Sequence, residues 1–151
     1  MRRAVLGCLL LASVAACNRA EKQLHQETQS SQERQSLKQF LEMAVASLGH
    51  RYDDQLRDVP DPERKVRFRV LFARDQLAAA DAYLATEPPI GAAARQAVDG
   101  YRAAKAGELG LYERLLAEKR YQRTEAEEQQ DAELRAQAEK HLETIGRMVD
   151  E

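Results

Sequence analysis

The side chains best suited to metal binding and proton transfer are scattered through this 151-residue chain. The three histidines are His25, His50 and His141, and none belongs to a His-Glu-x-x-His motif, which places two ligands for a zinc ion on one helix face. The neighbouring carboxylates Asp53-Asp54 and Glu127-Glu128 would point about 100° apart on a helix, so neither pair converges on one reacting bond. We therefore predict that these residues lie on solvated helix faces and form neither a metal site nor an acid–base site.

The nucleophilic side chains offer no catalytic pattern either. Ser and Thr residues are few, and no Gly-x-Ser-x-Gly turn is present. The seven glycines form no phosphate-binding loop. The two cysteines, Cys8 and Cys17, both belong to the first seventeen residues. We therefore expect a protein that is not an enzyme and that holds no cofactor and no metal ion.

The first sixteen residues have the pattern of an export signal. Arg2 and Arg3 are followed by an uncharged stretch, 4–16, and charge returns at Arg19. A membrane-spanning helix needs about 20 apolar residues, so this stretch is too short for a permanent anchor. Residues 1–16 are therefore predicted to be a cleaved signal peptide that takes no part in the fold.

Small residues end this leader at a cysteine, in the run Val14-Ala15-Ala16-Cys17. The run resembles the lipobox of bacterial lipoproteins. The resemblance implies that Cys17 receives palmitate-type acyl chains and becomes the new N-terminus, and two or three such chains give stable anchoring to a bilayer. Asn18 stands where enterobacterial lipoproteins of the inner membrane carry Asp, which implies the outer membrane and its periplasmic face. The alternative is an ordinary secretory peptide in which Cys17 is incidental.

Composition favours helix and argues against nucleic acid as a partner. The chain has 23 Lys and Arg residues against 25 Asp and Glu, and loss of Arg2 and Arg3 with the leader leaves a formal charge of −4. Trp is absent, and helix formers such as Ala, Glu, Gln, Arg and Leu dominate. Residues 17–36 are almost wholly polar. We interpret them as a lipidated tether, with a regular start to the first helix as the alternative.

Apolar residues then recur at alternating steps of four and three, the spacing of one buried helix face. The first series covers residues 37–59, the second begins with an Asp61-Pro62 cap and ends before Pro88, and the third covers 90–116. We predict an all-α fold in which an antiparallel helical bundle of three helices, or four, occupies residues 37–116.

Residues 117–151 are predicted to be a charged helical C-terminal extension. No large aliphatic residue occurs over 117–133, and apolar spacing returns only at Leu134. A single helix over 90–149 would be about 90 Å long, and the second helix would cover less than half of it. The extension must therefore fold back, pair with another subunit or bind a partner.

Two local features of the last helices follow from spacing alone. Gly107 and Gly110 should weaken the third helix, because glycine in a helix interior costs about 1 kcal/mol relative to alanine. Asp131 stands four residues before Arg135, the spacing of an ion pair on one helix face.

The second predicted helix opens with a basic run, residues 64–69, where the helix dipole disfavours positive charge. Phe68, Leu71 and Phe72 lie outside the four-three face. One interpretation is a central helix that packs on both sides and keeps its arginines at the rim. The other is an exposed aromatic–arginine surface for a protein partner or, as a lesser variant, for anionic lipid or polymer. The partner-binding residues would then be Arg64, Arg67, Phe68, Arg69 and Phe72.

Together these features predict a non-catalytic lipoprotein of the bacterial envelope. It would bind the bilayer through acylated Cys17 and an envelope protein through its helical domain, as a scaffold or adaptor. An immunity or inhibitor lipoprotein that blocks a periplasmic toxin or a cell-wall hydrolase is the alternative. An enzyme or small-ligand carrier with a pocket between helices is a more remote one.

Overall fold

The computed structural model divides the chain into two compact units, residues 1–33 and 34–151. The residues that it describes are 22–23, 26–46, 56–57, 59–85 and 91–150. In the first unit, the described residues are helical. The predicted signal peptide, Cys17 and Asn18 lie outside the described residues, as do residues 47–55 of the first predicted helix.

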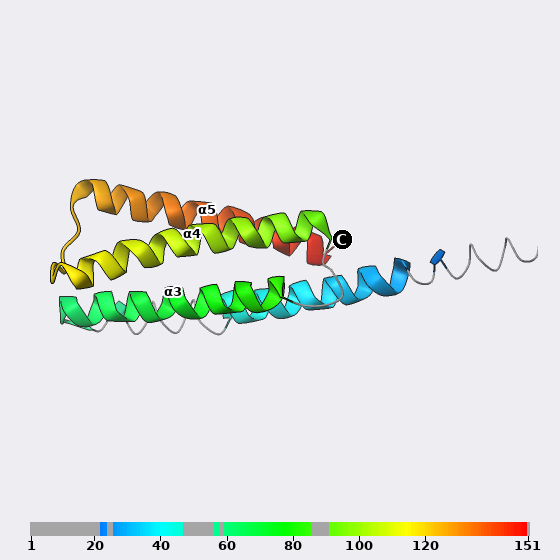
Figure 1. The fold of residues 1–151 in the computed structure, drawn as a ribbon, viewed down its shortest axis with the longest axis horizontal. Helices are drawn as coiled ribbons and strands as arrows, with labels where there is room; N and C mark the ends of the chain where they lie inside the picture. Colours follow the sequence, from blue (N-terminus) through cyan, green and yellow to red (C-terminus); the bar gives the residue numbers. More distant parts are fainter. Residues whose placement is uncertain (1–21, 24–25, 47–55, 58, 86–90, 151) are drawn as a thin grey trace, which may run out of the picture. The chain divides into compact units, whose positions relative to one another are not determined.

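The second unit is an all-α helical bundle, which confirms the predicted fold class. Residues 34–41 are α-helical and lead into a short π-helix, η1 (Glu42–Ala46). Three long helices follow, α3 (Pro62–Leu84), α4 (Ala92–Ala117) and α5 (Glu125–Asp150). They lie side by side with alternating direction (Figure 1). α4 packs against both α3 and α5, and α3 also contacts η1. No strand occurs among the described residues.

α5 is the last helix of the bundle, which refines the prediction of an extension over residues 117–151. The chain turns after α4, where Lys119 adopts a positive φ of 52°. α5 then runs back along α4 and buries Ala138 and Ile145 in the core that α4 shares with α3. Of the three fates that the sequence leaves open for this segment, folding back is the one observed.

Short polar signals mark where two of the helices begin. Asp61 Oδ1 accepts a hydrogen bond from the Glu63 backbone N–H at 3.1 Å, and Pro62 occupies the first turn of α3, as predicted. α5 begins at a capping box, in which Thr124 Oγ1 accepts from the Glu127 N–H at 3.3 Å and Glu127 Oε2 accepts from the Thr124 N–H at 2.9 Å. This Thr-x-x-Glu spacing is visible in the sequence, but it is a polar pattern, and apolar periodicity does not reveal it.

Two glycines let α5 approach α4 closely. A Cβ on Gly107 would lie 2.7 Å from Leu134 Cδ2, and a Cβ on Gly100 would collide with the His141 ring. α4 nevertheless runs as one helix from Ala92 to Ala117. Packing between the two helices therefore outweighs the local weakening that glycine was expected to cause.

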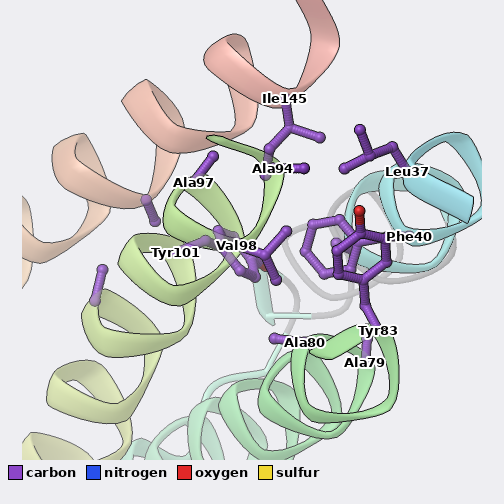
Figure 2. Packing of buried hydrophobic residues seen from close by; sticks show 13 residues of the cluster. Leu37, Phe40, Ala79, Ala80, Tyr83, Ala94, Ala97, Val98, Tyr101 and Ile145 are labelled. Carbon is purple, nitrogen blue, oxygen red and sulfur yellow. The ribbon is translucent and has the colours of Figure 1, made fainter. Parts of the chain in front are cut away.

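The larger apolar core is centred on Phe40 (Figure 2). Its ring centroid lies 5.5 Å from that of Tyr83 on α3 and 5.6 Å from that of Tyr101 on α4. Ile145 on α5 is fully buried in the same cluster. All three long helices and the residues before η1 thus contribute to one core, which fixes their positions relative to one another.

A smaller apolar cluster fills the other end of the α3–α4 pair. It consists of Val66, Val70, Tyr112 and Leu115. Tyr121, in the connection between α4 and α5, packs against it half-buried. The two clusters occupy different turns of the same helices, and the turns between them bury polar as well as apolar side chains.

Candidate functional site

A layer of buried polar side chains separates the two apolar clusters. On α4 it follows Ala104 of the larger cluster and precedes Tyr112 of the smaller one. Its buried members are Gln76, Lys105, Glu108 and Asp131. Charges buried in this way cost several kcal/mol unless they find partners, so the layer must neutralise itself.

Glu108 is the most deeply buried charge of the layer, with 2% of its side chain exposed. Lys105 Nζ donates to Glu108 Oε2 at 2.8 Å, and Arg135 NH2 on α5 lies 3.8 Å from Glu108 Oε1. The Lys105 ammonium group also lies 5.7 Å from the ring centroid of Phe72 and 5.9 Å from that of Tyr101. Glu108 therefore lies between two cations, and one of these also contacts aromatic rings.

Asp131 on α5 is the second buried carboxylate, and a tyrosine and two arginines surround it. Tyr112 Oη donates to Asp131 Oδ2 at 3.0 Å, and Arg123 donates to the same oxygen. Arg135 NH2 lies 2.9 Å from Asp131 Oδ2, which confirms the predicted pair, and donates to Tyr112 Oη at 3.1 Å. Burial, together with the charge of Asp131, raises the pKa of Tyr112, so the phenol keeps the proton that it donates.

A bidentate ion pair between Arg120 and Glu127 helps to hold the connection between α4 and α5, residues 118–124, in place. Arg120 NH1 and NH2 donate to the two carboxylate oxygens of Glu127, each at 2.7 Å. Hydrogen bonds from Arg120 and from the Thr124 N–H lower the pKa of Glu127 to about 2. A bidentate pair of this kind fixes geometry as well as charge, so the connection is a rigid support for the side chains that it carries.

A pocket of about 390 Å³ opens between the first half of α3, α4 and this connection, and we name it the basic pocket. Four cationic side chains line it, Arg57, Lys65, Arg69 and Arg123. Two tyrosines, Tyr112 and Tyr121, form part of its wall, beside apolar side chains. No carboxylate lines it within the part of the chain that the structure describes.

A second and smaller pocket, of about 180 Å³, lies over the buried layer between α3, α4 and α5. Lys105, Glu108 and Arg135 line it, and so does Glu139. Arg69 lines both pockets. The smaller pocket differs from the basic one because two carboxylates, Glu108 and Glu139, are among its lining residues.

The five predicted partner-binding residues do not share one exposed surface. Arg64 and Arg67 are exposed, and Phe68 is half-buried. The Arg64 guanidinium lies over the Phe68 ring, 5.6 Å from the ring centroid. Arg69 turns toward the pockets, and Phe72 is only 7% exposed. The prediction of Phe72 as a surface residue is therefore wrong, because its ring is buried beside the Lys105 ammonium group. For Phe72, the alternative of a central helix that packs on both sides holds.

Metal-ligating and membrane-spanning features are absent from the described residues. No three His, Cys, Asp or Glu side chains among them are grouped so that they could hold a metal ion. None of the described helices has the length and apolar character needed to cross a bilayer.

Comparison with known proteins gives no relative for this chain. No protein-family model matches it, and neither a curated protein nor a solved structure is significantly similar to it.

Proposed function

We propose that this protein is a non-catalytic adaptor or scaffold of the bacterial envelope. In this proposal acylated Cys17 holds it on the periplasmic face of the outer membrane, and one side of α3 binds a protein partner. The basic and apolar leader that ends at Val14-Ala15-Ala16-Cys17 supports the lipid anchor. The polar residues 17–36 support a tether that lifts the bundle off the bilayer.

The observation that carries the binding role is a mixed apolar and cationic strip on α3, which we name the outer ridge. It consists of Arg64, Arg67, Phe68 and Leu71, spaced three or four residues apart on one side of the helix. Leu71 is 50% exposed. Protein interfaces are enriched in aromatic and arginine side chains around apolar contacts, which is the composition of this strip.

The charge of the outer ridge indicates the kind of partner. Arg64 stacks on Phe68 and forms no ion pair with the described residues, whereas Arg67 is paired with Glu63 at 2.6 Å. A partner that presents a carboxylate beside an apolar pocket could accept Leu71 and Phe68 while pairing with Arg64. We therefore propose an envelope protein with an acidic, apolar-centred surface.

Site-specific photo-crosslinking in intact cells tests this role. A photoreactive amino acid at position 71 should yield one discrete adduct, which mass spectrometry then identifies. Arg64→Glu should abolish the adduct, because it places a negative charge opposite the acidic surface of the partner. The matched control carries the photoreactive group at Lys140, an exposed position of α5.

The adduct should also depend on the anchor, so Cys17→Ala should reduce it. Absence of a discrete adduct at position 71, or the same adducts from positions 71 and 140, would show that the outer ridge is an ordinary solvated surface.

A further inference from the structure

We propose that the smaller pocket, which α3, α4 and α5 line over the buried layer, binds the zwitterion of a small aliphatic amino acid. Such a molecule carries an ammonium group, a carboxylate and a short apolar side chain, and the pocket presents a counterpart for each of the three. The site is distinct from the outer ridge, so the proposal does not depend on the adaptor role.

Arg135 is the counterpart for the carboxylate of the ligand. Its NH2 atom lies 2.9 Å from Asp131 Oδ2 and donates to Tyr112 Oη at 3.1 Å, which holds the guanidinium in position before any ligand arrives. Its NH1 atom forms no hydrogen bond to the described residues, and its Nε atom is buried without an acceptor. A guanidinium carries five N–H groups, so Arg135 keeps a donor for a ligand although its charge is already paired.

Glu139 is the counterpart for the ammonium group. It is exposed, lines the pocket and forms no ion pair with any described residue. The other lining carboxylate, Glu108, already accepts from Lys105 Nζ at 2.8 Å. Because both signs of charge meet in this pocket, an ion of one sign is attracted by some side chains and repelled by others. A zwitterion can place each of its charges beside the opposite charge.

The apolar walls and the size of the pocket define the third part of the ligand. Phe72, Ala138 and Leu142 line the pocket, and burial of aliphatic surface against them is favourable. The volume of about 180 Å³ is below the range of about 300–1,000 Å³ that larger organic ligands occupy. These two features favour a side chain with the bulk of valine and leave no room for a nucleotide.

Nuclear magnetic resonance titration of the full isotope-labelled chain in a non-ionic detergent tests this site. The probes are valine, isovalerate, which lacks the ammonium group of valine, and isobutylamine, which lacks its carboxylate. We expect valine to shift the amide signals of Ala138 and Leu142 saturably at millimolar concentration. Isovalerate and isobutylamine should each bind about fivefold more weakly, because each loses one ion pair.

One variant then locates the ammonium group. Glu139 is exposed and forms no ion pair with the described residues, so Glu139→Gln leaves the fold intact. It should weaken the binding of valine about fivefold and leave the binding of isovalerate unchanged, because isovalerate has no ammonium group. The control, Glu128→Gln at another exposed position of α5, changes the net charge equally and should leave both affinities unchanged.

The proposal is overturned if valine causes no saturable shifts at millimolar concentration, or if either single-charge probe binds as tightly as valine does. It is equally overturned if Glu139→Gln weakens the binding of valine no more than Glu128→Gln does.

Discussion

Arg135 of α5 lies 3.8 Å from Glu108 of α4, and the two charges meet across the interface that forms when the C-terminal helix folds back. Glu108 also pairs with Lys105 of its own helix at 2.8 Å. The fold-back is thus stabilised by apolar contacts at Ala138 and Ile145 and by a charge network that only the complete bundle assembles.

Removal of one member of this network should be costly. Glu108→Leu leaves Lys105 buried without an acceptor, and we expect a loss of about 3–5 kcal/mol in the free energy of unfolding. Urea unfolding followed by circular dichroism measures this loss. The control is Glu113→Gln, which breaks the exposed pair with Arg74 and should cost less than about 1 kcal/mol. Equal losses in the two variants would mean that the buried pair contributes no more than a surface pair.

The two kinds of glycine on α4 should respond to alanine with opposite signs. Gly100→Ala places a methyl group against the His141 ring and should destabilise the bundle by about 1–3 kcal/mol. Gly110→Ala meets no atom within 4 Å and should stabilise α4 by about 1 kcal/mol. Thermal unfolding of both variants checks the signs. A gain from Gly100→Ala would show that α5 does not approach α4 as closely as described.

The ion pair in the α4–α5 connection predicts a pH dependence. The pKa of Glu127 falls from 4.5 to about 2 on folding, chiefly through its hydrogen bonds from Arg120. A carboxyl group whose pKa is lowered by folding stabilises the folded state at pH values above its unfolded-state pKa. This stabilisation is lost as the pH falls through the folded-state pKa. Glu127→Gln should therefore lower the free energy of unfolding by the largest amount at neutral pH. The difference from the unchanged protein should shrink as the pH drops from 4.5 to about 2. Urea titrations of both proteins over that range test it, and a deficit that stays constant with pH would contradict it.

Neighbouring residues on α3 should separate folding from binding. Phe72 is buried, so Phe72→Ala should cost about 3–5 kcal/mol of stability. Leu71 is 50% exposed, so Leu71→Ser should change stability by less than about 0.5 kcal/mol. Leu71→Ser should nevertheless abolish crosslinking from a photoreactive group placed at the neighbouring Arg67. Retention of the adduct in this folded variant would remove Leu71 from the interface.

The helices could be predicted from sequence because apolar spacing reports directly on a buried face. Val66, Val70 and Ala73 follow the four-three rhythm, and all three are buried in α3. The fate of α5 could not be predicted in this way. Its contacts with α4 use Asp131 and Arg135, which by residue type are expected in solvent.

The basic pocket was also beyond prediction from local pattern. It joins Lys65 of α3 to Arg123 of the α4–α5 connection, and no spacing rule relates residues so far apart in the chain. The aromatic pair Phe68 and Phe72 illustrates the same limit within one helix. Both lie outside the four-three face, yet only the position of the neighbouring α4 decides that Phe72 is buried beneath Lys105.

Mass spectrometry of the mature N-terminus, with membrane fractionation, tests the proposed envelope anchor most directly. The protein from a bacterium that makes it should begin at Cys17, carry the mass of two or three acyl chains and sediment with the membrane, whereas Cys17→Ala should not be acylated. An N-terminus at another residue, or an unmodified Cys17 in a soluble protein, would contradict the lipoprotein assignment and the adaptor role that rests on it.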